Sequence, residues 1–265
     1  MRCVLLILAM LIAPAAQACG VASDCVVGER IYRIAMPDGG AAPVGAVVWA
    51  HGYRGKASGV MRNGSLRRMV HARGLALIAL QGVNGSWDLP NGPHRPDSTG
   101  AAEFAYVGDV IADTQARFGI DPARLVASGF SAGGMLVWNL ACARPHLFAG
   151  FVPYSGTFWL EPPAQCARPA TSLIHIHGDN DATVPLAGRP IGPAQQGRVA
   201  DAFRMYAALG NFGVLAPGGT DRLRCMQSDN AAGELLGLCL FAGGHSFRTE
   251  YLGYALDRFR EAGRL

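Results

Sequence analysis

Charged residues are scarce in this sequence. Only 16% of the 265 residues are Asp, Glu, Lys or Arg, whereas globular domains average about 25%. Disordered chains and coiled coils need many more charges, so both classes are excluded. The basic residues are scattered and the net charge is only +4, so nothing in the charge pattern indicates a nucleic-acid partner or an anionic membrane surface. The hydrophobic content of 50% instead favours a globular protein with a sizeable core.

Cysteine pairs of the C-x-x-C type are missing, although the chain has seven cysteines. Zinc sites and thioredoxin-like redox sites are commonly built on such pairs, so their absence argues against both. We therefore expect no bound metal. The side-chain chemistry described below calls for no organic cofactor either.

The chain also lacks the run of about 20 apolar residues that a transmembrane helix requires. Its first residues are Arg2, a shorter apolar segment over residues 3–13, and the small-residue site Ala16-Gln17-Ala18. This order is typical of a secretory signal peptide. We predict that residues 1–18 are removed by cleavage after Ala18, that residues 19–265 form a single domain, and that the protein is secreted or periplasmic.

Cleavage would remove Cys3 and leave an even number of cysteines, which in an exported chain favours disulfides. Two antiparallel strands around the turn-rich segment 228–233 would place Cys225 opposite Cys239. Proximity along the chain suggests two further pairs, although six cysteines allow 15 connectivities. The predicted disulfides are Cys225–Cys239, Cys142–Cys166 and Cys19–Cys25. Lipid attachment at Cys19 is less favoured, because Ala16 stands where lipoprotein signals usually carry Leu.

Apolar runs alternate with segments of helical periodicity after the amino terminus. The predicted strands are 30–36, 44–50, 75–80, 125–127, 148–153, 172–176 and 235–241. The predicted helices are 61–72, 104–118, 135–143, 199–209 and 251–262. Such alternation indicates a mostly parallel central sheet with helices on both faces.

A candidate nucleophile stands where the strand ending at Ala127 turns into a helix. The segment Gly129-Phe130-Ser131-Ala132-Gly133 matches G-x-S-x-G, the turn that raises a serine hydroxyl above the sheet. The flanking glycines allow this sharp turn to close. Ser131 is therefore the predicted nucleophile, and it requires a base and an orienting acid.

Four histidines follow Ser131 in the chain. His175 and His177 lie on a buried strand and His146 lies at a helix end, so packing and capping are the roles expected of these three. His245 follows two glycines directly after the strand at 235–241, in a loop at a carboxyl end where active sites of α/β sheets lie. We predict His245 as the general base.

The acid and the oxyanion hole are expected in two other loops. Asp179 and Asp181 both follow the strand at 172–176, and spacing cannot choose between them; Glu161 and Asp229 are less well placed. The oxyanion donors are predicted to be the backbone N–H groups of Ala132, after the nucleophile, and Tyr53, after an early strand. His51 precedes Ser131, so we expect it to shape the loop and not to act as a base.

These segments together resemble the secreted polyhydroxybutyrate depolymerases and feruloyl esterases of the α/β-hydrolase superfamily. The resemblance runs from about Val47 to Phe247 and rests on five segments: His51-Gly52, Ile120–Arg124, Gly129–Gly134, His177–Pro185 and Gly243–His245. It implies an α/β-hydrolase fold without a large separate lid domain, and it selects Asp181 as the acid. It also suggests Trp87 as a substrate contact, although a core position is equally expected for this residue. The aromatic side chains of Phe158 and Trp159 could line the same site. The chain departs from such proteins at Ala102-Glu103, where a paired Asp is frequent, and at Tyr53-Arg54, where a Cys is frequent.

The activity that the resemblance implies is that of a secreted serine esterase working through an acyl-enzyme, most simply a polyhydroxybutyrate depolymerase acting as a monomer. A feruloyl or acetyl-xylan type esterase is the second substrate class that these motifs fit. The same fold also occurs in peptidases and acyltransferases, and a non-catalytic surface protein could have kept it.

Overall fold

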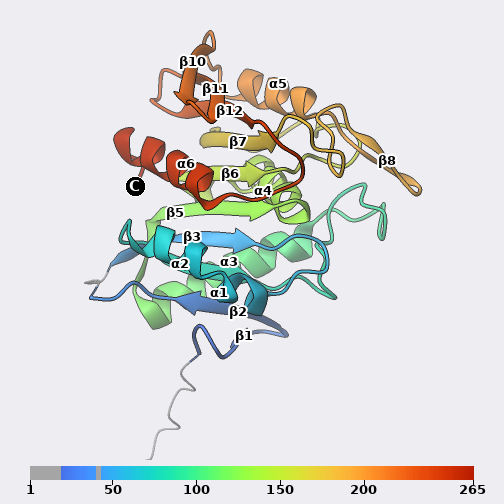
Figure 1. Cartoon of the computed structure of the whole chain (residues 1–265). Coiled ribbons are helices and arrows are strands. Elements are labelled where there is room, and N and C mark those ends of the chain that lie inside the picture. Colours follow the sequence, from blue (N-terminus) through green and yellow to red (C-terminus); the bar gives the residue numbers. More distant parts are fainter. Residues whose placement is uncertain (1–18, 40–42) are drawn as a thin grey trace, which may run out of the picture.

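A ten-stranded mixed sheet runs through the centre of the molecule (Figure 1). The structure is a computed structural model and describes residues 19–39 and 43–265. The predicted signal peptide, residues 1–18, lies outside the described residues. From one edge to the other the strands are β1 (Cys25–Val27), β2 (Arg30–Ala35), β4 (Ala76–Leu80), β3 (Val44–Ala50), β5 (Ile120–Phe130), β6 (Gly150–Tyr154), β7 (Ser172–Gly178), β12 (Leu235–Phe241), β11 (Leu223–Asp229) and β10 (Ala216–Thr220).

The centre of the sheet is parallel and its edges are antiparallel. Pairing is parallel from β4 through β3, β5, β6 and β7 to β12, and antiparallel at both ends. Every residue of β3, β4, β6 and β7 is buried. Continuous apolar runs are what strands covered on both faces require, and this explains why these strands could be predicted.

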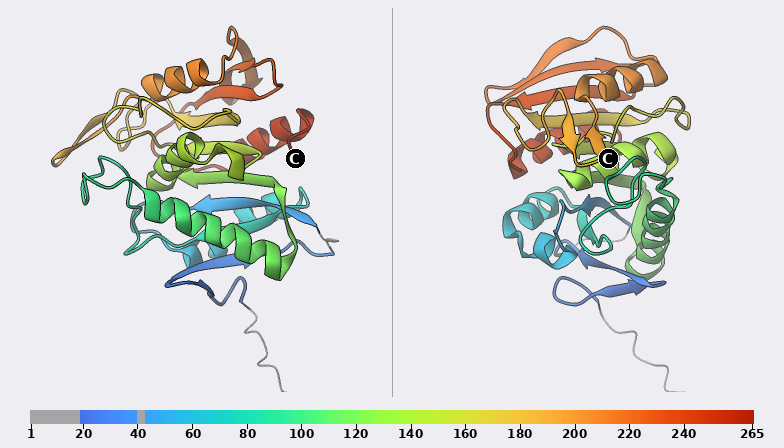
Figure 2. Two further views of the ribbon diagram at one scale, coloured as in Figure 1. Left: turned by 180° about the vertical axis from the view of Figure 1, so that it is seen from behind. Right: turned by 90° about the vertical axis from the view of Figure 1, so that its right-hand side faces the viewer.

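Helices cover both faces, as predicted (Figure 2). On one face α3 (Ala101–Phe118), α4 (Ala132–Ala143) and α5 (Val199–Leu209) pack in one core cluster, and the short 3₁₀ helix Pro145–Leu147 follows α4 along the chain. On the other face α1 (Ala57–Arg62), α2 (Gly64–His71) and α6 (Thr249–Glu261) pack in a second cluster. The fold is that of an α/β-hydrolase, and no separate lid domain is seen among the described residues.

The single helix predicted over residues 61–72 is wrong, because the chain breaks there at Asn63. Its backbone, with φ −73° and ψ 87°, is not helical, and its Oδ1 accepts a hydrogen bond from the Leu66 N–H at 3.0 Å. Asparagine is among the best residues for capping a helix start in this way. The segment therefore forms α1 and α2, which share the apolar periodicity but do not form one continuous helix.

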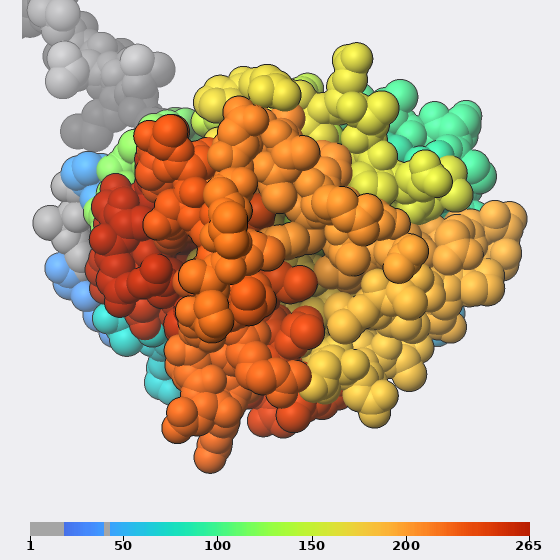
Figure 3. Space-filling view, turned by 90° about the horizontal axis from the view of Figure 1, so that it is seen from above, coloured from blue at the N-terminus to red at the C-terminus, as the bar shows by residue number. Residues whose placement is uncertain are grey.

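Several elements extend beyond the predicted ranges. The strand predicted at 125–127 is part of the longer β5, and α4 begins at Ala132, before the predicted start at Met135. The sequence did not predict β1, which has only three residues, the exposed β10, or the hairpin formed by β8 (Arg189–Ile191) and β9 (Ala194–Gln196). The β8–β9 hairpin projects from one side of the molecule, beyond the face formed by α5 and the strands from β10 to β12 (Figure 3).

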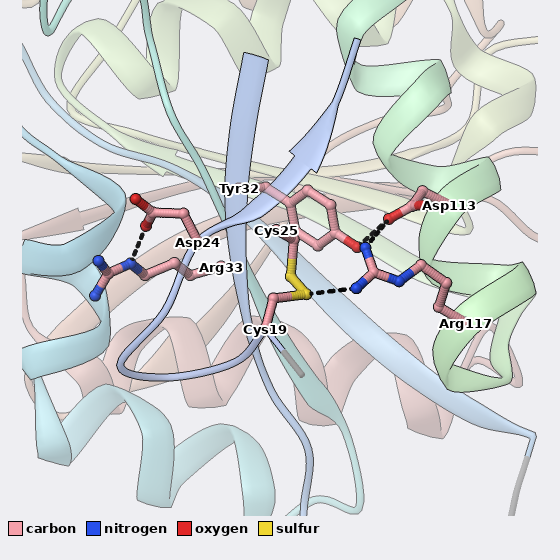
Figure 4. Close-up of a disulfide and its surroundings, with 7 residues drawn as sticks. All are labelled: Cys19, Asp24, Cys25, Tyr32, Arg33, Asp113 and Arg117. Carbon is pink, nitrogen blue, oxygen red and sulfur yellow. Dashed lines mark hydrogen bonds and ion pairs between the residues drawn. A yellow bond between two sulfur atoms is a disulfide. The ribbon is translucent and has the colours of Figure 1, made fainter. Parts of the chain in front are cut away.

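All three predicted disulfides are present: Cys19–Cys25, Cys142–Cys166 and Cys225–Cys239. Cys225 and Cys239 are direct partners in the antiparallel pairing of β11 with β12, as the turn between them indicated. Cys19–Cys25 joins the first described residues to β1, next to the hydrogen bond of 2.5 Å from Tyr32 Oη to Asp113 of α3 (Figure 4).

No helix in the described part of the chain combines the length and the apolar character needed to cross a membrane.

Candidate active site

Ser131 lies at the turn between β5 and α4, one residue after Phe130 and one before Ala132. Its backbone has φ 59° and ψ −120°, a conformation that costs a non-glycine residue free energy and is concentrated at functional sites. The flanking glycines are sterically required. A Cβ on Gly133 would lie 2.0 Å from Ala50 O, and one on Gly129 would lie 2.6 Å from Gly133 O. The turn thus closes against the end of β3 and leaves the serine at its tip.

Three side chains from separate loops meet here. His245 Nε2 lies 2.9 Å from Ser131 Oγ, and His245 Nδ1 lies 2.6 Å from Asp181 Oδ2. The Asp181 side chain has no exposed surface, and that of His245 is 17% exposed. A carboxylate can only accept, so Nδ1 carries the proton and Nε2 is left to accept from the Ser131 hydroxyl. The structure therefore brings Ser131, His245 and Asp181 into one hydrogen-bonded row.

The Asp181 carboxylate is held ionised by its neighbours. Oδ1 accepts the backbone N–H groups of Thr183 and Val184, each at 2.9 Å. Burial on its own would raise the pKa of Asp181, but the hydrogen bonds from His177, the Val184 N–H and His245 outweigh burial and hold this pKa well below its usual range. Asp181 is therefore charged at neutral pH.

The two aspartates that the sequence left open have different partners. Asp179 is exposed, accepts the Gly243 N–H at 3.1 Å and pairs with Arg224 at 3.0 Å. It ties the loop that carries His245 to β11 and does not contact the imidazole ring. Glu161 is exposed in the loop after β6, and Asp229 lies at the end of β11. Asp181 is the acidic residue hydrogen-bonded to His245.

His175 and His177 of β7 are fully buried and form a row leading to the Asp181 loop. His177 Nε2 lies 2.8 Å from Val184 O, which can only accept, so this nitrogen carries the proton. His177 Nδ1 then accepts from His175 Nε2 at 2.9 Å. His177 Nε2 is also 3.4 Å from Asp181 Oδ2. The sequence indicated packing for both histidines but gave no signal of this contact with the acid, because it depends on how the loop folds back over the strand.

The loop after β3 passes beside Ser131. A Cβ on Gly52 would lie 3.5 Å from the Ser131 Cβ, so the chain between His51 and Tyr53 runs directly alongside it. The Tyr53 side chain is 53% exposed, but the predicted role belongs to its backbone N–H. Neither this N–H nor that of Ala132 has a hydrogen-bond acceptor among the described residues. His146 is exposed in the turn after α4, away from these groups.

The two tryptophans predicted as substrate contacts differ in their surroundings. Trp87 is only 6% exposed, and its Nε1–H donates to His51 O at 2.8 Å, a position that fits a core residue. Trp159 is half-buried beside Gly92, and its backbone pairs with Gln196 of the β8–β9 hairpin.

A cavity of about 240 Å³ opens next to Phe130, whose ring centroid lies 4.6 Å from that of His245. The walls of the cavity are largely apolar and include Trp49, Val60, Leu66 and Phe247.

No group of three or more His, Cys, Asp or Glu side chains within residues 19–39 and 43–265 is arranged to hold a metal ion.

Residues 91–190, which include Ser131 and Asp181, match the family described as phospholipase/carboxylesterase. NocK of Nocardia uniformis subsp. tsuyamanensis, a protein described as an esterase, is 29% identical over 88% of this chain and 76% of its own length. The chain is a carboxylic ester hydrolase.

This esterase is also similar to one protein in sequence and to another in fold. Feruloyl esterase C of Emericella nidulans is 27% identical over 61% of this chain, which spans a little over half, 58%, of that protein's length. The structure of an acetyl xylan esterase from Aspergillus awamori superimposes with a TM-score of 0.65, covering 89% of this chain and 95% of that one at 14% identity. At that identity the similarity shows the shared fold.

Proposed function

We propose that this esterase cleaves its substrate through a Ser131–His245–Asp181 triad and an acyl-enzyme intermediate. The observation that supports this proposal best is the unbroken row of hydrogen bonds from Ser131 Oγ through the His245 ring to Asp181. A base within hydrogen-bond reach of the nucleophile, itself oriented by a third group, is the arrangement that activates a serine.

The proposed reaction begins with attack of Ser131 Oγ on the ester carbonyl carbon. His245 Nε2 takes the hydroxyl proton, and Asp181 stabilises the imidazolium that forms. Collapse of the tetrahedral intermediate breaks the bond to the alcohol, which leaves with the proton returned by His245. Water then attacks the acyl-enzyme with the same base, releasing the acid and restoring Ser131.

The oxyanion of the tetrahedral intermediate is proposed to accept hydrogen bonds from the N–H groups of Tyr53 and Ala132. Both amides lie beside Ser131 in the chain or in space, and neither has another acceptor among the described residues. As the first residue of α4, Ala132 also adds the positive end of the helix dipole. The loss of one such donor typically slows an enzyme by about 10²–10³-fold.

The substrate that we propose is an ester of a plant-polysaccharide type, with a feruloyl or acetyl group on the acid side. The name of one relative, a feruloyl esterase, favours this class over the polyhydroxybutyrate that the sequence motifs first suggested. The largely apolar walls of the cavity beside Phe130 are compatible with an aromatic acid. Hydrolysis rates on methyl ferulate, acetylated xylan and amorphous polyhydroxybutyrate, measured side by side, separate these candidates. Preference for the polyester would contradict the proposed substrate class.

We further propose that residues 19–265 form one exported domain. Six paired cysteines support export, because disulfides persist in oxidising compartments and are rare in the cytosol. The central sheet, which contains strands from both ends of the described chain, supports a single domain.

The central test of this proposal is Ser131→Ala. We expect its kcat on p-nitrophenyl butyrate to fall by about 10⁶-fold, because the nucleophile is lost while the fold is kept. Circular dichroism of the variant checks that the fold is intact. Activity within tenfold of the wild type in a folded variant would rule out the proposed nucleophile.

A further inference from the structure

His51 lies one residue beyond β3, where the chain leaves the sheet for the loop that carries Tyr53. Its side chain is buried, and both ring nitrogens bind backbone groups. The Gly82 N–H donates to Nε2 at 3.0 Å, and Nδ1 lies 2.8 Å from Gly52 O. A backbone N–H can only donate, so Nε2 must accept and Nδ1 must carry the proton. His51 is therefore held as the Nδ1–H tautomer, opposite to that of His177.

The carbonyl that accepts from His51 belongs to the same peptide group as the Tyr53 N–H. This peptide is trans, and in a planar trans peptide the C=O and the N–H point in opposite directions. Gly52 O accepts both from His51 Nδ1–H and from the Gly55 N–H at 2.9 Å. Two donors thus hold the carbonyl on one side of the loop, and the Tyr53 N–H is held on the other.

This peptide needs such a restraint more than most. Glycine tolerates a far wider range of backbone angles than other residues, so the Gly52–Tyr53 peptide could rotate at low cost without an external partner. The chain at Gly52 passes close to Ser131, and a Cβ added there would lie in ordinary van der Waals contact with the Ser131 Cβ, at 3.5 Å. The orientation of the Tyr53 N–H therefore depends on the two hydrogen bonds that hold Gly52 O, one from the Gly55 N–H of the local turn and one from the His51 ring.

We propose that His51 is a positioning residue that locks the Gly52–Tyr53 peptide with its N–H directed at the oxyanion formed on attack by Ser131. This inference rests on the oxyanion role proposed above for the Tyr53 N–H. His51 does not touch the reacting atoms and acts through the carbonyl of Gly52.

The surroundings of His51 keep it in the required form. Burial lowers the pKa of His51, which favours the neutral ring and preserves the acceptor for Gly82. Protonation would place a donor at Nε2, facing the Gly82 N–H. On the other side of the loop, Trp87 Nε1–H donates to His51 O, and the two rings lie 4.8 Å apart between centroids. From its buried position, Trp87 thus holds the backbone of His51 in place.

Two substitutions separate the two hydrogen bonds of the ring. In His51→Asn the side-chain amide nitrogen stands near the position of Nδ1, so donation to Gly52 O is kept. In His51→Gln the longer amide stands near the position of Nε2, so the contact with Gly82 is kept and the donor to Gly52 O is lost. We expect kcat on p-nitrophenyl butyrate to fall by about 10- to 100-fold in His51→Gln, with KM changed less than threefold. His51→Asn should stay within about tenfold of the wild type.

A tetrahedral analogue provides a second readout, because it tests the oxyanion site directly. Butylboronic acid adds to a serine hydroxyl as a tetrahedral anion, and its affinity should fall in His51→Gln by about the same factor as kcat/KM. The exposed His146 serves as the matched control, and His146→Asn and His146→Gln should leave both quantities unchanged. Equal kcat in the two His51 variants, or a loss confined to KM, would overturn the proposal.

If the variants fail to fold, the wild-type protein alone still tests whether His51 donates a hydrogen bond to Gly52 O. A long-range ¹H–¹⁵N spectrum of the histidine rings, assigned through the backbone, should show His51 with its proton on Nδ1. The Nε2–H tautomer would overturn the proposal without touching the triad. If Ser131 were not the nucleophile, the Ser131→Ala variant would keep its activity and this spectrum would be unchanged. Failure of the proposed function and failure of the His51 proposal are therefore distinguishable.

Discussion

The residue that orients His245 must place a charged oxygen against the ring and be unable to turn toward water. Asp181 meets both requirements, because its carboxylate is buried and both of its oxygens are occupied by N–H donors. Asp179, two residues earlier, is exposed and bridges the loop to Arg224. The difference arises from the fold of the loop after β7 and not from the identity of the residues.

Asp181→Asn should lower kcat by about 10⁴-fold, because the amide cannot hold the Nδ1–H tautomer of His245. Asp179→Asn, the matched control, should lower kcat less than tenfold, because it only weakens the hydrogen bond from the Gly243 N–H to the side chain at position 179. Steady-state kinetics on p-nitrophenyl butyrate measure both. Similar losses in the two variants would contradict the assignment of Asp181.

The residues of the candidate site could be predicted where local chemistry restricts the choice. The two glycines around Ser131 are required by contacts with Ala50 and with each other, and such a requirement leaves a readable pattern. Trp87 shows the opposite case. Its indole N–H partner, His51 O, is 36 positions away in the chain, so no local pattern could show that it would be buried.

At the scale of single elements, β7 carries the buried histidine row into the site. Burial first, and then the neighbouring His177, hold the pKa of His175 well below its ordinary value, so His175 is neutral in the folded protein. In the unfolded chain its pKa returns to about 6.5. As the pH falls below that value, the unfolded state takes up a proton that the folded state refuses, and stability decreases.

His175→Gln should therefore reduce the acid sensitivity of folding. Between pH 6 and 5 the free energy of unfolding should fall less steeply than in the wild type, by up to about 1.4 kcal/mol per pH unit for one proton. Urea denaturation at a series of pH values measures the slope, with the exposed His146→Gln as the control. Parallel curves for the wild type and His175→Gln would show that His175 remains able to titrate in the fold.

The helices show what periodicity can and cannot predict. Residues 61–72 have the correct apolar spacing for one helix, yet Asn63 ends α1 and caps α2. An asparagine within a helical pattern can face solvent or start a new helix, and the choice depends on how the chain packs on β4 and α6. The strands of β3, β4 and β7 were predictable because burial on both faces leaves a continuous apolar run.

At the scale of the whole molecule, the three disulfides close loops of different lengths. They close loops with separations of 24 residues for Cys142–Cys166, 14 for Cys225–Cys239 and 6 for Cys19–Cys25. A disulfide restricts the unfolded chain more when it closes a longer loop.

Replacement of each cysteine pair by serine should lower the free energy of unfolding in that order. The expected losses are about 3.4 kcal/mol for the 142–166 pair, about 3.0 for 225–239 and about 2.2 for 19–25. Guanidinium denaturation of the three double variants measures them. A larger loss for 19–25 than for 142–166 would show that local contacts, such as those around Tyr32 and Arg117 in Figure 4, outweigh the loop entropy.

The parallel centre of the sheet, the helices on both faces and the cysteine pairing could all be predicted from the sequence, because each follows from local pattern or chain proximity. The edge strands β1 and β10 and the β8–β9 hairpin could not. Every residue of β10 is exposed, and β8 and β9 bury little, so pairing with a neighbour and not apolar burial defines them.

Active-site labelling tests the central claim, that Ser131 is a nucleophile activated by His245, most directly. The wild-type protein is treated with a fluorophosphonate, digested and mapped by mass spectrometry. We predict one label per chain on Ser131, with rates of labelling that fall sharply in Asp181→Asn and are zero in Ser131→Ala. A label on any other residue, or none on an enzyme that still hydrolyses p-nitrophenyl butyrate, would contradict the claim.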